Sequence, residues 1–318
     1  MNQFKLDIID LFNRKRGGHV DHWLYRDALR GQVSGSQLWH QFLKASKSYY
    51  VLKNEIELIS RLASTQDSNF QAIDTIIDFG VGNDLAVRKK IIPLVHGLKN
   101  VKAYIGIDIS KSFLDKADAV INGETSLETY TIQGDFYSAL PPFPGNHRLG
   151  LMLGSTITNQ NMREGAEFPE DKILSKLSHL RKLLHEGDKM LITFYSNTDR
   201  ASVYDAYTNV YWSRHIEGLM YDVSKIAIGD FKADGWQHQK VWGIKAPVIH
   251  QCLEATVNQS FNIGDESFEV KRGERFVAVN NFKFPVSLFQ SLCKKSGFSL
   301  GNIYADPLSY MHIQELNP

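Results

Sequence analysis

The sequence is poor in cysteine, in net charge and in long apolar runs. Its 318 residues include only 2 cysteines, Cys252 and Cys293, which lie far apart and form no CxxC pair. A disulfide-stapled secreted domain is therefore disfavoured, and we expect a reduced, cytoplasmic setting. The formal net charge is +1, without a long run of one sign. Nucleic acid and anionic membranes usually require a concentrated basic face, so neither is an expected partner.

Two further signatures are missing. No apolar stretch is long enough to span a bilayer, and the first residues lack the apolar core of a signal peptide. The 11 histidines form no HxxxH or HExxH group, so we expect no metal site. With 43% hydrophobic and 22% charged residues, the chain instead has the composition of a globular protein with a sizeable core.

The stretch from Ile73 to Gly82 is the most informative part of the chain. Its β-branched and aromatic residues predict a buried strand over Ile73–Phe79, and Gly80 and Gly82 predict a turn. The apolar spacing is then helical over 84–98. A strand, a glycine turn and a helix in this order bring backbone N–H groups close to a ligand, because glycine has no Cβ to clash. Such a turn also occurs as a plain βα connection.

The same alternation of strands and helices continues along the chain. Further strands are predicted over 103–108, 127–133, 149–153 and 190–194, with Ser110 as one helix N-cap and a helix from Pro169 to Gly187 between the last two. Five strands alternating with helices predict an α/β fold with a doubly wound, mostly parallel sheet and right-handed crossovers.

The segments that flank this alternation have other patterns. Residues 1–70 and 199–230 have helical spacing, and several short strands are predicted between Trp236 and Phe284. We therefore expect residues 1–70 and 199–284 to form a smaller α+β accessory lobe that binds the substrate. Residues 71–198 and 285–318 are expected to form the sheet domain, with a helix and two returning strands at its end.

Polar residues follow the predicted strands at one edge of the sheet, where doubly wound folds bind their ligands. These are Asp78, Asp108, Asp135 and the pair Ser155-Thr156. Each acid alone could be a helix cap or a solvated loop end. Asp108 at the tip of the second strand can accept both hydroxyls of a ribose, which favours a nucleoside. A dinucleotide turn would have a third glycine near Leu85, so the two-glycine turn favours S-adenosylmethionine, which has no pyrophosphate.

Further motifs extend over most of the chain. They are Gly35-Ser36-Gln37-Leu38-Trp39 with Tyr49-Tyr50, Asp78-Phe79-Gly80-Val81-Gly82, Asp108-Ile109-Ser110, Gly134-Asp135-Phe136, Leu153-Gly154-Ser155-Thr156-Ile157-Thr158-Asn159, Asp199 with Tyr207, and Gly273-Glu274 with Lys283-Phe284. With these motifs the chain resembles the histidine-specific, S-adenosylmethionine-dependent methyltransferase family. The best-known member of that family trimethylates the α-amino group of histidine in ergothioneine biosynthesis. The motif that ends at Asn159 is specific to the family.

The resemblance implies a Rossmann-like class I methyltransferase fold and a role for each matching residue. Asp108 would hold the ribose of S-adenosylmethionine, and Asn159 and Tyr207 would hold the α-carboxylate of an amino acid. Tyr49 or Tyr50 is the candidate catalytic group that helps the substrate ammonium lose its proton. The expected cofactor-binding residues are Asp78, Gly80, Gly82, Asp108, Ser110, Asp135, Phe136, Gly154, Ser155 and Thr156. The expected substrate-binding residues are Trp39, Tyr49, Asn159, Tyr207, Val279 and Asn281.

The match fails where the family reads the histidine side chain. In the family a glutamate and a serine stand just before the Lys-Tyr pair, and alignment on Lys283-Phe284 puts Val279 and Asn281 there. An isopropyl group cannot accept an imidazole N–H, and leaving that donor unpaired costs about 1–3 kcal/mol. We therefore predict N-methylation of an amino acid, or a close relative, other than histidine. The alternatives are methylation of another small molecule at N, O or S, and a non-catalytic nucleoside-binding subunit.

Overall fold

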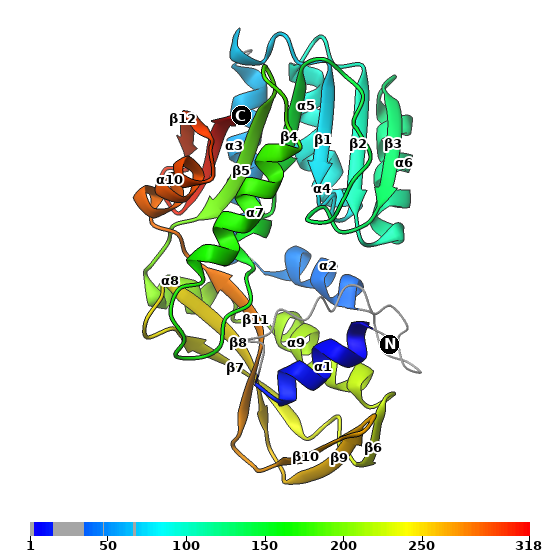
Figure 1. Cartoon of the computed structure of the whole chain (residues 1–318), viewed down its shortest axis with the longest axis vertical. Coiled ribbons are helices and arrows are strands. Elements are labelled where there is room, and N and C mark those ends of the chain that lie inside the picture. Colours follow the sequence, from blue (N-terminus) through cyan, green and yellow to red (C-terminus); the bar gives the residue numbers. More distant parts are fainter. Residues whose placement is uncertain (1–2, 15–34, 47, 66–67) are drawn as a thin grey trace. The chain divides into compact units, whose positions relative to one another are not determined.

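The computed structural model describes residues 3–14, 35–46, 48–65 and 68–318, and these residues form two compact units (Figure 1). The lobe unit comprises Met1–Tyr50, Thr158–Pro169 and Thr198–Lys283. The sheet unit comprises Val51–Ile157, Glu170–Asn197 and Phe284–Pro318. This division differs from the predicted boundaries mainly at residues 51–70, which pack with the sheet, and at residues 158–169, which pack with the lobe.

The sheet unit is built on a 7-stranded sheet of order β12-β13-β5-β4-β1-β2-β3. Strands β1 to β5 are parallel to one another, whereas β13 is antiparallel to both β5 and β12. The predicted doubly wound, mostly parallel sheet is therefore confirmed, and the last two strands return to it as expected. The strands are β1 Thr75–Phe79, β2 Ala103–Asp108, β3 Glu128–Gln133, β4 Arg148–Met152, β5 Lys189–Tyr195, β12 Ser299–Ala305 and β13 Met311–Asn317.

Helices pack against this sheet, so that β1, β2 and β4 are buried along their whole length. Helix α3 lies in close contact with the backbone at Gly97, where a Cβ would collide with the carbonyl group of Ala63. Helical spacing in the sequence shows which side of α3 is apolar but does not show its partner. The helices are α3 Tyr50–Ser64, α4 Asp84–Ala86, α5 Ile92–Gly97, α6 Lys111–Glu124, α7 Glu170–Lys182 and α10 Val286–Lys295, with short 3₁₀ turns at Ser68–Phe70 and Thr156–Thr158.

The helix predicted over 84–98 is interrupted. A π-helical turn, η3 Val87–Ile91, separates α4 from α5, and the N–H of Ile92 donates to the carbonyl of Val87. Pro93 follows directly and has no N–H to continue the usual ladder. Such turns often accompany functional positions, and this one holds the buried Lys90.

The lobe unit contains two 3-stranded antiparallel sheets, of order β10-β9-β6 and β11-β8-β7. The ring of Phe12 in α1 lies within 5.7 Å of rings from β7, β9, β10 and β11, and so links both sheets in one core. Strands β6 and β9 were not predicted, because both are short and rich in polar or small residues. The elements are α1 Gln3–Phe12, α2 Gly35–Ala45, α8 Arg200–Ala206, α9 Val210–Val223, β6 Ala227–Asp230, β7 Trp236–Trp242, β8 Val248–Ala255, β9 Gln259–Ile263, β10 Glu266–Val270 and β11 Arg275–Phe282.

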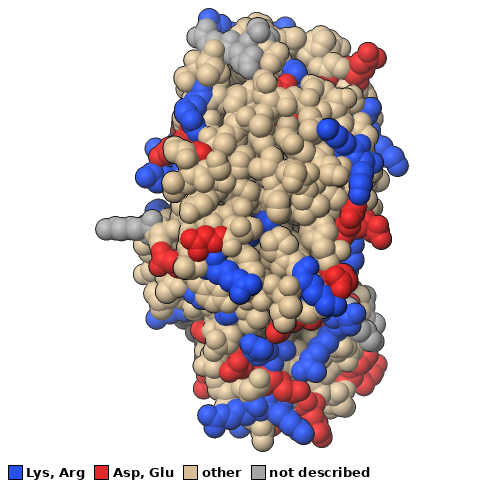
Figure 2. Space-filling view, turned by 90° about the vertical axis from the view of Figure 1, so that its left-hand side faces the viewer, with Lys and Arg blue, Asp and Glu red and all other residues tan. Residues whose placement is uncertain are grey.

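Two surface properties bear on the expected partners. On the face shown in Figure 2, acidic and basic side chains are interspersed, in keeping with the net charge of +1. Within the described part of the chain, the helices are all too short or too polar to cross a membrane.

Candidate cofactor and substrate residues

Asp108 joins two predicted cofactor motifs in the sheet unit. It is the last residue of β2 and is 8% exposed. Its carboxylate accepts the N–H of Ser110 at 2.7 Å and the N–H of Gly82 at 3.4 Å, so the turn after β1 lies against the tip of β2. Ser110 is the N-cap residue of α6, as predicted. A carboxylate held in this way by backbone groups is a fixed acceptor for ligand hydroxyls.

The glycine turn brings three predicted strand tips together. Gly80 and Gly82 have φ values of +92° and +67°, which L side chains rarely adopt. A Cβ at Gly80 would lie 3.6 Å from Cε1 of Phe136 and 3.9 Å from Oγ1 of Thr156. The acid next to Phe136, Asp135, is exposed and accepts the N–H of Tyr137 at 2.9 Å. Gly80, Phe136 and Thr156, which the sequence assigns to the cofactor, therefore lie close together at one edge of the sheet.

Asp78 does not end its strand. β1 ends at Phe79, the last residue of the predicted strand, and Phe79 pairs with Ile107. The Asp78 side chain is 2% exposed and accepts the hydroxyl of Tyr104 at 3.0 Å. Burial raises the pKa of this carboxyl to about 7. Asp78 therefore contributes to the floor beneath the turn rather than to its exposed edge.

The turn after β4 has its backbone amides bonded inside the sheet unit. Gly154 and Ser155 both have positive φ, at 69° and 54°. The N–H of Gly154 donates to Oε1 of Glu55 at 2.5 Å, and the N–H of Ser155 donates to Oγ1 of Thr193 at 3.0 Å. The strained serine conformation is thus held by bonds on both amides. These two N–H groups are therefore not available to a cofactor.

Glu55 organises this region, and sequence reasoning missed it. Its side chain is 1% exposed, and Oε2 forms an ion pair with Lys90 at 2.9 Å. Oε1 also accepts the hydroxyl of Thr193 at 2.6 Å. A signal was available, because Glu55 lies on the apolar side of α3 in line with Val51, Leu58, Ile59 and Leu62. A carboxylate on an apolar stripe indicates a buried partner.

The predicted substrate residues of the lobe unit share an aromatic cluster. The rings of Tyr49 and Tyr207 are 5.7 Å apart, and Trp39 lies 6.0 Å from Tyr49. Trp212 of α9 contacts both Trp39 and Tyr207, at 5.6 and 5.3 Å. Tyr50 begins α3 and is half-buried. The cluster thus brings together Trp39, Tyr49 and Tyr207, which lie far apart in the sequence.

Polar residues of β11 belong to the same unit. Asn281 Nδ2 donates to Oδ1 of Asn159 at 2.9 Å, so two predicted residues are in direct contact. Val279 is 4% exposed and lies two residues before Asn281, on the same side of the strand. Lys283 follows, with Nζ 5.4 Å from the ring centre of Tyr207. Burial lowers the pKa of this lysine to about 7.

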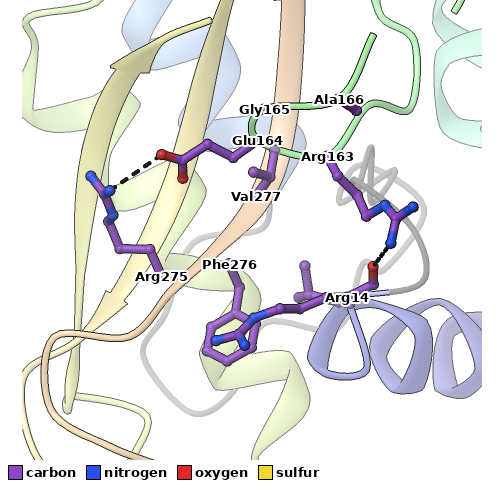
Figure 3. Close-up of a pocket in the computed structure, with 9 residues that line it drawn as sticks. Arg14, Arg163, Glu164, Gly165, Ala166, Arg275, Phe276 and Val277 are labelled. Atoms are coloured by element: carbon purple, nitrogen blue, oxygen red, sulfur yellow. Dashed lines mark hydrogen bonds and ion pairs between the residues drawn. The ribbon is translucent and has the colours of Figure 1, made fainter. Parts of the chain in front are cut away.

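A cavity of about 560 Å³ also lies in the lobe unit (Figure 3). Its arginines are engaged within the protein: Arg275 pairs with Glu164 at 3.3 Å, and Arg163 donates to the carbonyl of Arg14 at 3.3 Å. The described residues that line it include none of those predicted to bind cofactor or substrate. We therefore do not assign it a part in the reaction.

Comparison with known proteins gives distant relatives and one family. Residues 4–318 match the family described as "Histidine-specific methyltransferase, SAM-dependent". N-methyltransferase imqF of Aspergillus flavus is 22% identical over 92% of this chain and 83% of its own length. N-methyltransferase fsqC of Aspergillus fumigatus is 21% identical, over 82% of this chain and 71% of its own. Ergothioneine biosynthesis protein 1 of Neurospora crassa is 27% identical over 51% of this chain and 18% of its own length.

The family match extends from α1 to the end of the chain and therefore includes both units. It confirms three predictions: the family resemblance, S-adenosylmethionine as the cofactor, and methyl transfer as the reaction. The chain belongs to the family of histidine-specific, S-adenosylmethionine-dependent methyltransferases.

Proposed function

We propose that this enzyme methylates the amino group of a free amino acid, or a close relative, that is not histidine. The observation that carries the proposal is the Asn281–Asn159 hydrogen bond of 2.9 Å with buried Val279 beside Asn281 on β11. Asn159 is the residue that the family resemblance assigns to the α-carboxylate. Val279 occupies the place where the resemblance expects a glutamate for the imidazole.

The substitution at Val279 changes which side chain the enzyme can accept. No glutamate or aspartate lies within two residues of Val279 or Asn281. An imidazole N–H placed there would lose its acceptor, at about 1–3 kcal/mol, or roughly 5- to 150-fold in affinity. A side chain without such a donor avoids this loss. The relatives named N-methyltransferase support nitrogen, rather than oxygen or sulfur, as the methyl acceptor.

The proposed roles divide between the units. Residues of the sheet unit hold the cofactor: Asp108 takes the ribose, Asp135 and Phe136 the adenine end, and Gly80 and Gly82 the methionine portion. When bound, S-adenosylmethionine supplies an electrophilic methyl group on a sulfonium. Residues of the lobe unit hold the substrate, with Asn159 and Tyr207 on its carboxylate.

Only a neutral amine has the lone pair needed for attack, so the protein must favour loss of the ammonium proton. The aromatic surroundings of Tyr49, which is 7% exposed, disfavour a cation that lacks water around it. We assign to the oxygen of Tyr49 or Tyr50 the role of receiving or relaying this proton, without being a strong base. The chain's main task is to position the amine.

Calorimetric titration of the protein, saturated with S-adenosylhomocysteine, with each of the standard L-amino acids tests the proposal. We expect one or a few amino acids to bind at least about 10-fold more tightly than histidine. The same amino acids, incubated with S-adenosylmethionine carrying a labelled methyl group, should gain the label on nitrogen by mass spectrometry. Tightest binding by histidine would overturn the substrate assignment, and label on oxygen or sulfur would favour the alternative small-molecule methyltransferase.

A further inference from the structure

Four buried or half-buried side chains of the lobe unit form one continuous hydrogen-bonded chain. Trp212 Nε1 donates to Oε1 of Gln251 at 3.0 Å. Gln251 Nε2 donates to Oδ1 of Asn281 at 3.2 Å, and Asn281 Nδ2 donates to Oδ1 of Asn159 at 2.9 Å. Gln251 is 0% exposed, Trp212 2% and Asn281 6%. The chain therefore runs from the core of the unit to half-buried Asn159.

The chemistry of Trp212 fixes the direction of every bond. An indole nitrogen can only donate, so the group of Gln251 that faces it must be the carbonyl oxygen. The amino group of Gln251 then faces Asn281, which must turn its own oxygen inward and its amino group toward Asn159. The oxygen of Asn159 receives this last bond, and its amino group is left at the outer end. Reversing any one amide would place two donors or two acceptors against each other.

His238 supports the same direction. Its Nε2 lies 2.7 Å from Oε1 of Gln251, and its Nδ1 lies 3.0 Å from the hydroxyl of Ser213. Because Gln251 presents its oxygen, His238 must carry its proton on Nε2 and accept from Ser213 on Nδ1. Burial lowers the pKa of His238 to about 4, so the ring is neutral at pH 7, as this pattern requires. Both lone pairs of the Gln251 oxygen are then in use.

We propose that Gln251 and Trp212 are positioning residues that hold Asn159 as a hydrogen-bond donor to the substrate's carboxylate. This inference rests on the proposed function and extends it. The oxygens of Gln251, Asn281 and Asn159 each accept a bond along the chain, so the group left at its outer end is the amino group of Asn159, a donor. An outward amino group favours ligands that bring acceptors, above all a carboxylate.

Inverting the chain tests the proposal. Gln251→Glu at pH 8 keeps the size of the side chain but replaces the amino group by an acceptor. Asn281 would then turn its amino group inward, and Asn159 would present its oxygen outward. The test compares the amino acid that binds most tightly with the amine that lacks its carboxylate, and the first such pair is L-phenylalanine and phenethylamine. We expect the affinity for the amino acid to fall about 10- to 100-fold. Affinity for the decarboxylated amine and for S-adenosylmethionine should change less than about threefold.

Two variants complete the experiment. Trp212→Phe removes the donor that sets the direction of the hydrogen-bonded chain. It should also weaken binding of the amino acid more than binding of the amine. Gln239→Glu on β7 adds the same charge on the other side of the same sheet, opposite Cys252, and should leave both affinities unchanged. Equal losses for the amino acid and its amine, or no loss in Gln251→Glu, would overturn the proposal.

Failure of the proposed function would give a different experimental result. If the wild-type protein binds S-adenosylmethionine but no amino acid, the substrate assignment falls, and the direction of the chain is then decided without a ligand. Neutron diffraction from perdeuterated wild-type protein locates the amide deuterons. Deuterons on Gln251 directed at Asn281, and on Asn281 directed at Asn159, are expected, and the reverse arrangement would overturn the inference.

Discussion

The buried polar side chains of the two units differ in charge. In the described part of the sheet unit, many of them are ionisable and lie close to a partner, whereas in the lobe unit they are mainly amides and neutral rings. The buried charged residues of the sheet unit are Glu55, Asp78, Lys90, Asp108, Arg148, Asp188, Asp306 and Glu315. The buried polar residues of the lobe unit are Thr158, Gln160, His215, His250, Gln251, Gln259, Asn280, Asn281 and Lys283.

The two units therefore hold their loops in place by different interactions. The sheet unit uses ion pairs, such as Glu55–Lys90 at 2.9 Å and the Arg148–Asp188 pair, in which guanidinium Nε and Nη2 both bond to Asp188. Such a pair joins two separate elements firmly, but removal of one partner leaves a buried charge without its counterion. The hydrogen-bonded amides of the lobe unit have a fixed donor-to-acceptor direction but carry no net charge. They can therefore bind an ionic ligand without a charged side chain among them that competes for it.

The largest effect is expected where the charged network is broken on one side. Glu55→Gln leaves the Lys90 ammonium buried without its carboxylate, and urea unfolding should show a loss of about 3–5 kcal/mol in the free energy of unfolding. Glu57→Gln on the same helix is the control, because its pair with Lys53 is exposed and 3.9 Å long.

Removing both partners sharpens this result. The double variant Glu55→Met with Lys90→Met has no unpaired charge and should recover most of the lost stability. A double variant no more stable than Glu55→Gln would show that the hydrogen bonds of Glu55 to Gly154 and Thr193 dominate instead.

The lobe unit should respond to pH through its buried Lys283. The pKa of Lys283 is lowered by burial to about 7 from 10.5, so between these values the unfolded chain binds a proton that the folded chain does not. Stability should therefore fall as the pH is lowered from about 10 to 7, by up to about 1.4 kcal/mol per pH unit. Lys283→Met should flatten this slope in chemical unfolding, whereas exposed Lys245→Met should keep it.

The sheet unit should show the opposite slope at lower pH. Burial raises the pKa of Asp78 to about 7 from 3.8, so the folded chain holds a proton that the unfolded chain has lost. The contribution of Asp78 to stability should be greatest at about pH 4 and below, and it should fall as the pH rises to 7, again by up to about 1.4 kcal/mol per unit. Asp78→Asn should remove this contribution. If the variant kept the wild-type slope, the carboxylate would be ionised in the folded protein.

The smallest expected effect concerns the cofactor. Asp108→Asn keeps the shape of the side chain but loses the charge that we assign to the ribose hydroxyls. Calorimetry should show S-adenosylmethionine binding about 10- to 100-fold more weakly, as for a lost hydrogen bond to a charged group. Asp115→Asn on the exposed side of α6 is the matched control. Equal affinity of wild type and Asp108→Asn would remove the ribose assignment.

Much of the sheet unit was accessible from the sequence. Buried parallel strands are short apolar runs, and their alternation with helices was visible from Ile73 to Phe194. The π-helical turn at Val87–Ile91 was not, because helical spacing does not show a shift of the hydrogen bonds by one residue. The position of α3 was also missed, since an apolar side does not identify what it packs against.

The site was only partly accessible. The motifs predict Asp108, Asn159 and Tyr207 as site residues, and the structure places Asn159 against Asn281 and Tyr207 against Tyr49. The side chains that hold such residues were missed, because their partners are remote in sequence. Glu55 bonds to the N–H of Gly154, and Gln251 on β8 bonds to Asn281 on the neighbouring strand β11.

The bulge in β11 affects how this strand should be compared between relatives. Val277 pairs with Cys252 and Val279 with Gln251, so Ala278 is an extra residue. Deleting it would give a regular ladder and leave Val279 and Asn281 on the same side. The strand can therefore absorb insertions or deletions at this point during evolution without exchanging the residues of the substrate cluster. Alignments of relatives should be anchored downstream, at Lys283-Phe284, rather than upstream at Gly273-Glu274.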